Sequence, residues 1–122
     1  MNVPDFKLPG DDATRTDSGL RYEEVTPGDG ASPGPRDRVT VHYAGWLTDG
    51  TPFDSSYSRG ETIQFPLDGV IPGWTEGVQL MKEGGTFRFL IPPELAYGPR
   101  GAPPVIGPNE TLVFQVELVK VG

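Results

Sequence analysis

The sequence predicts an α+β domain in which the apolar face of an antiparallel β-sheet packs against one short helix. Several short segments alternate apolar and polar residues, which is the period of a half-buried strand. Only one segment carries apolar residues at helical spacing. Glycine (17) and proline (14) make up about a quarter of the 122 residues, so the chain turns often and its elements are short. The length favours a single domain.

Residues 1–17 are expected to form a flexible N-terminal tail, and residues 18–122 the folded domain. Prolines, glycines and aspartates interrupt the tail, and its apolar residues follow no period. It therefore buries too little surface to offset an ordering entropy of ~1–2 kcal/mol per residue. The alternative is an arm packed through Val3, Phe6 and Leu8.

The first half of the domain predicts three strands. Residues 20–25 form the first, and residues 39–43 the second, in which apolar and polar side chains alternate. Asp49 and Gly50 then predict a turn, because this dipeptide favours tight turns. Residues 62–67 predict a further short strand.

One helix is expected over residues 74–82. Gly84 and Gly85 follow this segment and are expected to end the helix. Gly77 inside it costs about 1 kcal/mol relative to alanine, so we expect close packing to require a glycine there. The apolar face of the helix consists of Trp74, Val78 and Met81.

Two more strands are predicted at residues 86–91 and 112–118, and the second alternates most regularly. Between them, residues 92–110 contain six prolines and three glycines. This pattern predicts a long structured loop, and loops of this length are often functional.

Composition excludes several kinds of site. The chain has no cysteine, so disulfides, thiolate metal sites and cysteine nucleophiles are excluded. His42 is the only histidine, which rules out a metal site built from several histidines and is expected to be solvent-facing or hydrogen-bonded. The formal net charge of −7 argues against a nucleic-acid surface. The acidic residues are scattered, and no spacing singles out a catalytic carboxylate pair.

No membrane span is visible in the sequence, because no apolar run approaches ~18–20 residues. No signal peptide is visible either, because the N-terminus lacks a basic region followed by an apolar one. We therefore expect a cytoplasmic protein, or a periplasmic one if the chain is a trimmed mature form. No dimerisation helix is apparent between residues 68 and 100, so we expect a monomer.

Six segments stand in an order and spacing that resemble a known family. They are Val41-His42-Tyr43-Ala44-Gly45, Gly50-Thr51-Pro52-Phe53-Asp54-Ser55-Ser56, Val70-Ile71-Pro72-Gly73-Trp74-Thr75-Glu76-Gly77, Gly84-Gly85, Ile91-Pro92-Pro93-Glu94-Leu95-Ala96-Tyr97-Gly98 and Asn109-Glu110-Thr111-Leu112-Val113-Phe114. Through them, residues 18–122 resemble the FKBP-type peptidyl-prolyl cis-trans isomerases, the macrolide-binding immunophilins, and most nearly the short bacterial members.

The resemblance implies a bent antiparallel sheet wrapped around one short helix, and an enzyme that accelerates rotation about X-Pro bonds during protein folding. It implies proline-containing polypeptides as substrates, inhibition by macrolides such as FK506 or rapamycin, and no cofactor or metal. By motif position, Trp74 resembles the floor of a proline pocket. The walls would be Tyr43, Phe53, Val70, Ile71 and Phe114.

The resemblance also implies polar groups around that pocket. Tyr97 corresponds to a hydroxyl at the rim, and the Ile71 N–H to a second donor for a ligand carbonyl. Asp54 corresponds to the acidic residue beside the tyrosine, with Arg59 as its charge partner. The apolar flap of the long loop would be Val105 and Ile106.

Two departures from the family pattern affect the expected substrate contacts. Ile63 stands where many members carry an aromatic wall, so the pocket is expected to be wider there. Ala102 stands where some members have a larger loop residue. Both changes concern substrate preference and macrolide affinity more than basic activity.

Each assignment has a structural alternative in the residues themselves. Trp74 and Phe114 fit an ordinary core, and Tyr43 fits a strand tyrosine with an ordinary partner. Asp54 fits the cap of a local turn, and Arg59 fits an unpaired surface arginine. The alternative function is a prolyl-peptide-binding or chaperone module with negligible turnover that uses the same pocket.

Overall fold

The protein is described by a computed structural model of residues 3–122, whose elements are short, as the glycine and proline content predicts. The strands are β1 (Thr14–Arg15), β2 (Arg21–Thr26), β3 (Arg38–Leu47), β4 (Pro52–Ser55), β5 (Ile63–Pro66), β6 (Thr86–Ile91) and β7 (Leu112–Val121). The α-helices are α1 (Ser56–Arg59) and α2 (Pro72–Val78), and single turns of 3-10 helix cover Leu67–Gly69, Pro93–Leu95 and Gly98–Arg100.

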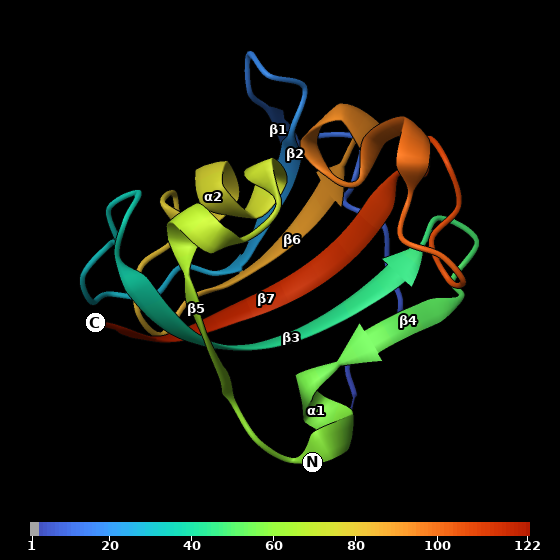
Figure 1. Ribbon diagram of the computed structural model, residues 1–122. Helices are drawn as coiled ribbons and strands as arrows, with labels where there is room; N and C mark the ends of the chain where they lie inside the picture. Colours follow the sequence, from blue (N-terminus) through green and yellow to red (C-terminus); the bar gives the residue numbers. More distant parts are fainter. Residues whose placement is uncertain (1–2) are drawn as a thin grey trace.

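All strands belong to one antiparallel sheet, and α2 lies across one of its faces (Figure 1). The strand order is β1-β2-β6-β7-β3-β4, and β5 pairs with the opposite end of β3. This bent sheet around one short helix confirms the predicted α+β class. Within residues 3–122, no helix has both the length and the apolar character required to cross a bilayer.

The alternating strands separate the apolar residues between the two faces of the sheet, as predicted. On the side of α2, residues such as Val41, Phe89 and Val116 form the main core, and all three are fully buried. A smaller cluster on the opposite side includes Trp46 and Val113. The helix therefore covers the larger apolar face.

Helix α2 is shorter than the predicted 74–82 segment and ends at Val78 rather than at the Gly84-Gly85 pair. After it, Leu80 N–H and Met81 N–H bond the carbonyls three residues back, at 3.0 and 3.1 Å, so the chain continues as turns. Met81 remains fully buried, which explains why the apolar period extends beyond the helix.

Gly77 confirms the expected close packing. A Cβ at this position would lie 2.6 Å from Cε1 of Phe89, well inside ordinary contact distance. Gly73, one turn earlier, approaches Ile91 equally closely, with a Cβ to Cγ2 distance of 2.6 Å. The two glycines let α2 rest directly on the side chains of β6.

Of residues 3–17, which we expected to be a flexible tail, the first part runs along the face of the sheet opposite α2, and β1 extends the edge of the sheet beside β2 (Figure 1). Strand β1 pairs with β2, and the Phe6 ring meets Trp46 edge to face at 5.8 Å. Val3, Phe6 and Leu8 are all exposed, at 40%, 36% and 44%. The described residues thus form an arm that pairs with β2 and contacts Trp46 through Phe6, without burying the three apolar side chains of the alternative. Met1 and Asn2 lie outside the described residues.

The loop over residues 92–110 is structured, as predicted. Its middle is closed by a two-way backbone bridge between Ala102 and Ile106, with N to O distances of 2.8 and 3.1 Å. Asn109 N–H also bonds Gly98 O at 2.9 Å. These bonds hold the loop across the end of the sheet beside the pocket described below.

Candidate active site

A pocket of about 440 Å³ opens between α2 and the sheet. Strands β3, β4, β5 and β7 contribute its walls, and the start of α2 contributes its floor. The lining residues are Tyr43, Phe53, Asp54, Phe65, Gly69, Val70, Ile71, Trp74, Tyr97 and Phe114. Six of these ten residues are aromatic, so the cavity is predominantly apolar.

Trp74 lies at the centre of the aromatic lining. Its ring meets Tyr43 at 5.3 Å and Phe114 at 5.4 Å, both nearly perpendicular at 86° and 85°. Phe53 in turn meets Phe114 at 5.4 Å and 86°. Such edge-to-face pairs stabilise by about 0.5–1.5 kcal/mol beyond burial, so each ring fixes its neighbour's position.

Local sequence explains how these rings reach the pocket. Trp74 lies in the first turn of α2, which Pro72 begins with a fixed φ angle suited to a helix start. On β3, Gly45 leaves space for the rings: a Cβ there would lie 2.7 Å from Cζ of Phe53 and 2.8 Å from Cε1 of Phe114. A side chain at position 45 would displace the wall.

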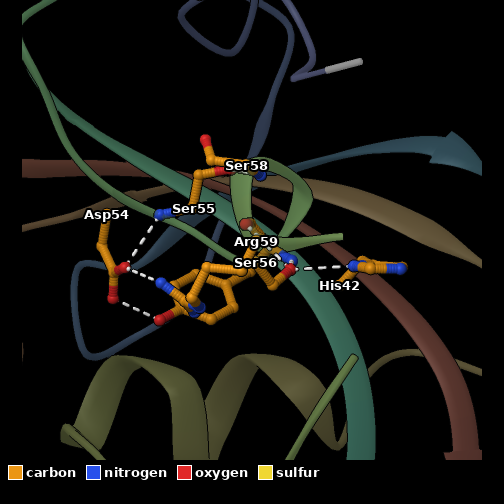
Figure 2. Close-up of polar contacts among 7 residues, drawn as sticks. His42, Asp54, Ser55, Ser56, Ser58 and Arg59 are labelled. Atoms are coloured by element: carbon orange, nitrogen blue, oxygen red, sulfur yellow. Dashed lines mark hydrogen bonds and ion pairs between the residues drawn. The ribbon is translucent and has the colours of Figure 1, made fainter. Parts of the chain in front are cut away.

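The polar part of the pocket is a carboxylate held by three donors. Asp54 Oδ1 accepts from Arg59 Nη1 at 2.8 Å and from the Ser55 N–H at 2.8 Å, while Oδ2 accepts from the Tyr43 hydroxyl. Figure 2 shows Asp54 facing Arg59 and Ser55. The structure therefore confirms Arg59 as the charge partner of Asp54.

These contacts fix the charge state of both pocket acids. Burial raises the pKa of Asp54, but the hydrogen bonds from Tyr43, Arg59 and the Ser55 N–H outweigh burial and hold this pKa below its ordinary value. Burial, and then the hydrogen bond to Asp54, raise the pKa of Tyr43 to about 12. At neutral pH the carboxylate is charged and the phenol is neutral.

Most residues expected at the site meet in this pocket. Trp74 and Phe114 are each 4% exposed and belong to the core while also lining the cavity, so a place in the core and a place in the pocket lining do not exclude each other. Tyr97 is 42% exposed, as expected of a rim hydroxyl. The expected residues that line the pocket are Tyr43, Phe53, Asp54, Val70, Ile71, Trp74, Tyr97 and Phe114.

Ile63, which was expected at the pocket wall, does not line the pocket. It pairs with Val41 and packs against the core. Phe65, two residues later on the same face of β5, supplies the aromatic wall and meets Trp74 at 5.5 Å. The alternation in residues 62–67 could have identified Phe65, because residues i and i+2 of a strand share a face.

The three residues expected from the long loop also lie outside the pocket lining. Ala102 and Ile106 form the backbone bridge, and Ile106 is 5% exposed and belongs to the main core. Val105 lies between them in sequence and is 48% exposed. The loop is thus anchored by Ile106, and of these three residues Val105 is the one whose side chain is exposed to solvent.

His42 is buried and hydrogen-bonded, the second of the two states expected for it. Its Nδ1 lies 2.9 Å from Ser56 Oγ, and its ring stacks on Tyr57 at 4.7 Å. Figure 2 shows His42 facing Ser56. It lies on β3 beside Tyr43, and its side chain packs on the face opposite α2 with Tyr57.

Comparison with known proteins gives consistent matches. The family model described as FKBP-type peptidyl-prolyl cis-trans isomerase matches residues 30–119. A Neisseria meningitidis serogroup B protein, named as a probable FKBP-type peptidyl-prolyl cis-trans isomerase FkpA, is 56% identical over 112 residues, covering 92% of this chain and 41% of its own length. The FKBP-type 22 kDa peptidyl-prolyl cis-trans isomerase of Escherichia coli K12 is 54% identical over 106 residues, covering 87% and 52%.

Solved structures agree with the sequence matches. The crystal structure of FkpA from Escherichia coli superposes with a TM-score of 0.88 at 52% identity, covering 92% of this chain and 52% of that one. A Legionella longbeachae relative, 51% identical over 104 residues with coverage of 85% and 45%, is named "Outer membrane protein MIP". The chain thus spans about half, or less, of the length of these relatives.

Proposed function

The chain belongs to the FKBP-type peptidyl-prolyl cis-trans isomerase family, and from this premise we propose that it accelerates cis-trans rotation about X-Pro bonds in other polypeptides. The observation that carries the proposal is the aromatic pocket, floored by Trp74 and walled by Tyr43, Phe53, Phe65 and Phe114. Its size and apolar lining suit a proline ring. The names of the chain's relatives support the same activity.

The pocket can catalyse this rotation without proton transfer. An X-Pro amide is held planar by resonance, and its rotation barrier is about 18–20 kcal/mol. Rotating the bond by a quarter turn removes the resonance and reduces the charge separation of the amide. An apolar, water-poor pocket therefore stabilises the twisted state more than the planar one, which is the requirement for catalysis. Each ~1.4 kcal/mol of that difference gives a tenfold rate increase.

Two donors at the pocket can orient the substrate chain. The Ile71 N–H makes no intramolecular hydrogen bond within residues 3–122, and Ile71 precedes α2 at the pocket wall. The Tyr97 hydroxyl lies at the exposed rim. Bonds from these groups to two substrate carbonyls would hold the peptide in a turned conformation and lower the entropy lost on reaching the transition state.

Asp54 and Tyr43 act as fixed walls rather than as acid and base. The lowered pKa of Asp54 and the pKa of about 12 for Tyr43 keep both in one protonation state near neutral pH. The two carboxylate oxygens are shared among Tyr43, Arg59 and Ser55. The charge thus has a fixed position at the edge of the pocket.

A protease-coupled isomerisation assay on an X-Pro test peptide, with and without rapamycin, tests the proposal. We expect turnover that rapamycin blocks, because drug and proline would compete for the same pocket. Loss of a central ring in Trp74→Leu should lower kcat/KM by about tenfold or more. Rapamycin binding without turnover would instead indicate the binding-module alternative.

The substrates we propose are proline-containing polypeptides, acted on by a monomeric protein. For location, the relatives give no support to the cytoplasmic expectation, and one is named an outer membrane protein. We therefore propose the second expectation, a periplasmic place of action. Fractionation of source cells with an antibody to the chain tests the location, and sedimentation tests the monomer.

A further inference from the structure

The backbone of Tyr43 lies where the sheet divides. Strand β3 pairs with β5 as far as Val41 and with β4 from Ala44 onward, so no strand adjoins Tyr43 on that side. On its other side, Tyr43 lies opposite Val116 of β7. Tyr43 is only 6% exposed, and a buried backbone N–H or carbonyl needs a hydrogen-bond partner.

The Ser56 hydroxyl takes the place of the missing strand. Its Oγ accepts from the Tyr43 N–H at 2.7 Å and lies 3.3 Å from the Tyr43 carbonyl, to which it can donate. Ser56 is fully buried and is the first residue of α1. One side chain thus satisfies both backbone groups at the division of the sheet.

His42 controls the direction of the Ser56 hydroxyl proton. The Nδ1 atom lies 2.9 Å from Ser56 Oγ, and a serine hydroxyl has a single proton to donate. If Nδ1 carries hydrogen and donates, the Ser56 proton is free for the Tyr43 carbonyl. If Nδ1 is bare, it competes for that proton and the Tyr43 carbonyl loses its partner.

The same serine is linked to the pocket carboxylate by two routes. Through the strand, it fixes Tyr43, whose hydroxyl binds Asp54 Oδ2. Through the helix, α1 runs from Ser56 to Arg59, which binds Asp54 Oδ1 at 2.8 Å. A displacement of Ser56 would therefore move both groups that hold the carboxylate at the pocket edge.

We propose that Ser56 and His42 are positioning residues for the isomerase pocket, and that the hydrogen-bearing Nδ1 form of His42 is the one that supports it. Neither residue lines the pocket, so their effect passes through Tyr43 and Asp54. The expected effect of these two residues on catalysis rests on the proposed function. The arrangement of the hydrogen bonds can be tested without catalysis.

The test compares Ser56→Ala with Ser58→Ala, an exposed serine of the same helix whose side chain makes no hydrogen bond in residues 3–122. A second pair contrasts His42→Phe, which keeps the stacking on Tyr57, with His42→Asn, which can restore a donor near the Nδ1 position. Exchange NMR on an X-Pro peptide gives kcat and KM separately. Nitrogen-15 NMR gives the His42 tautomer and the hydrogen exchange of the Tyr43 amide.

We expect Ser56→Ala to speed Tyr43 amide exchange and to lower kcat, each by about tenfold, while KM changes by less than about twofold because the aromatic rings remain. Ser58→Ala should match the wild type. His42→Phe should lower kcat, and His42→Asn should restore at least half of that loss. Nitrogen-15 shifts should show hydrogen on Nδ1.

A bare Nδ1 in the folded wild type would overturn the assignment to His42. An unchanged kcat in folded Ser56→Ala, or an equal loss in Ser58→Ala, would overturn the role of Ser56. If Ser56→Ala does not fold, the two His42 variants decide the question. Absence of turnover in the wild type would defeat the proposed function, and the tautomer and amide exchange would still decide the positioning.

Discussion

Replacement of Gly77 by alanine tests the packing that places the pocket floor. Alanine favours a helix over glycine by about 1 kcal/mol, so in an exposed helix the change would stabilise the fold. Here the new Cβ would lie 2.6 Å from Cε1, 3.0 Å from Cζ and 3.1 Å from Cδ1 of Phe89, where ordinary contact is 3.4–4 Å. Phe89 is fully buried, so its ring or the helix must shift.

Such overpacking of a core costs about 1–3 kcal/mol, which exceeds the gain in helix propensity. We expect Gly77→Ala to lower the free energy of unfolding by about 1 kcal/mol. For a domain of this size that corresponds to a fall in Tm of about 3–6 °C. Because Trp74 lies one turn earlier on α2, kcat/KM should fall as well.

Urea and thermal unfolding measure the stability change, and a double-mutant cycle identifies its cause. In a Phe89→Leu background the ring that meets the new Cβ is gone, so Gly77→Ala should be neutral or stabilising there. A stabilising effect of Gly77→Ala in the wild type would refute the close approach of α2 to β6. An equal cost in both backgrounds would refute Phe89 as its cause.

Four further outcomes follow from the contacts of the pocket and the arm. Tyr43→Phe should raise the pKa of Asp54, because one of the hydrogen bonds that oppose the effect of burial is lost. A carbon-13 titration of the Asp54 carboxyl measures this pKa. An unchanged pKa would contradict the hydrogen bond between Tyr43 and Asp54. The pKa of Asp54 is lower in the folded protein than its ordinary value of 3.8, so the charged carboxylate stabilises the fold above pH 3.8. This stability is lost as pH falls through the folded pKa. In Asp54→Asn, the free energy of unfolding should therefore fall less with decreasing pH below 3.8 than in the wild type. The raised pKa of Tyr43 contributes stability that is complete below pH 10 and is lost as pH rises towards 12, and Tyr43→Phe should remove this alkaline loss. Phe6→Ala should lower the free energy of unfolding by about 1 kcal/mol, because the edge contact with Trp46 is lost. It should leave kcat/KM unchanged, since Phe6 lies across the sheet from the pocket. A fall in kcat/KM would show that the arm reaches the site.

Strands were predictable where one face is buried, because a period of two then records the burial directly. Residues 112–118 illustrate this, whereas β7 continues to Val121 only after a register shift against β3 between Leu118 and Lys120. Elements of four residues are too short to show such a pattern in the sequence. Strand β4 and helix α1 were not predicted, since four residues show neither a strand period nor a helical face.

The site was predictable through the family resemblance and less so from the residues alone. Trp74 and Phe114 serve both core and pocket, and composition cannot separate these roles. Phe65 was missed because the family motif points to position 63, whereas the aromatic wall comes from the next inward residue of the same strand, two positions later. The arm is held by the pairing of β1 with β2 and by the contact of Phe6 with Trp46, which are 40 positions apart, and no local pattern encodes that contact.

The most direct measurement of the account is the exchange rate between cis and trans forms of an X-Pro peptide in the presence of catalytic amounts of the chain. Wild type should accelerate exchange, and Phe53→Ala, which opens one aromatic wall while leaving the buried core residues in place, should lose about tenfold or more in kcat/KM. A natively folded Phe53→Ala protein with the wild-type rate, or a wild type with no acceleration, would contradict catalysis in this pocket.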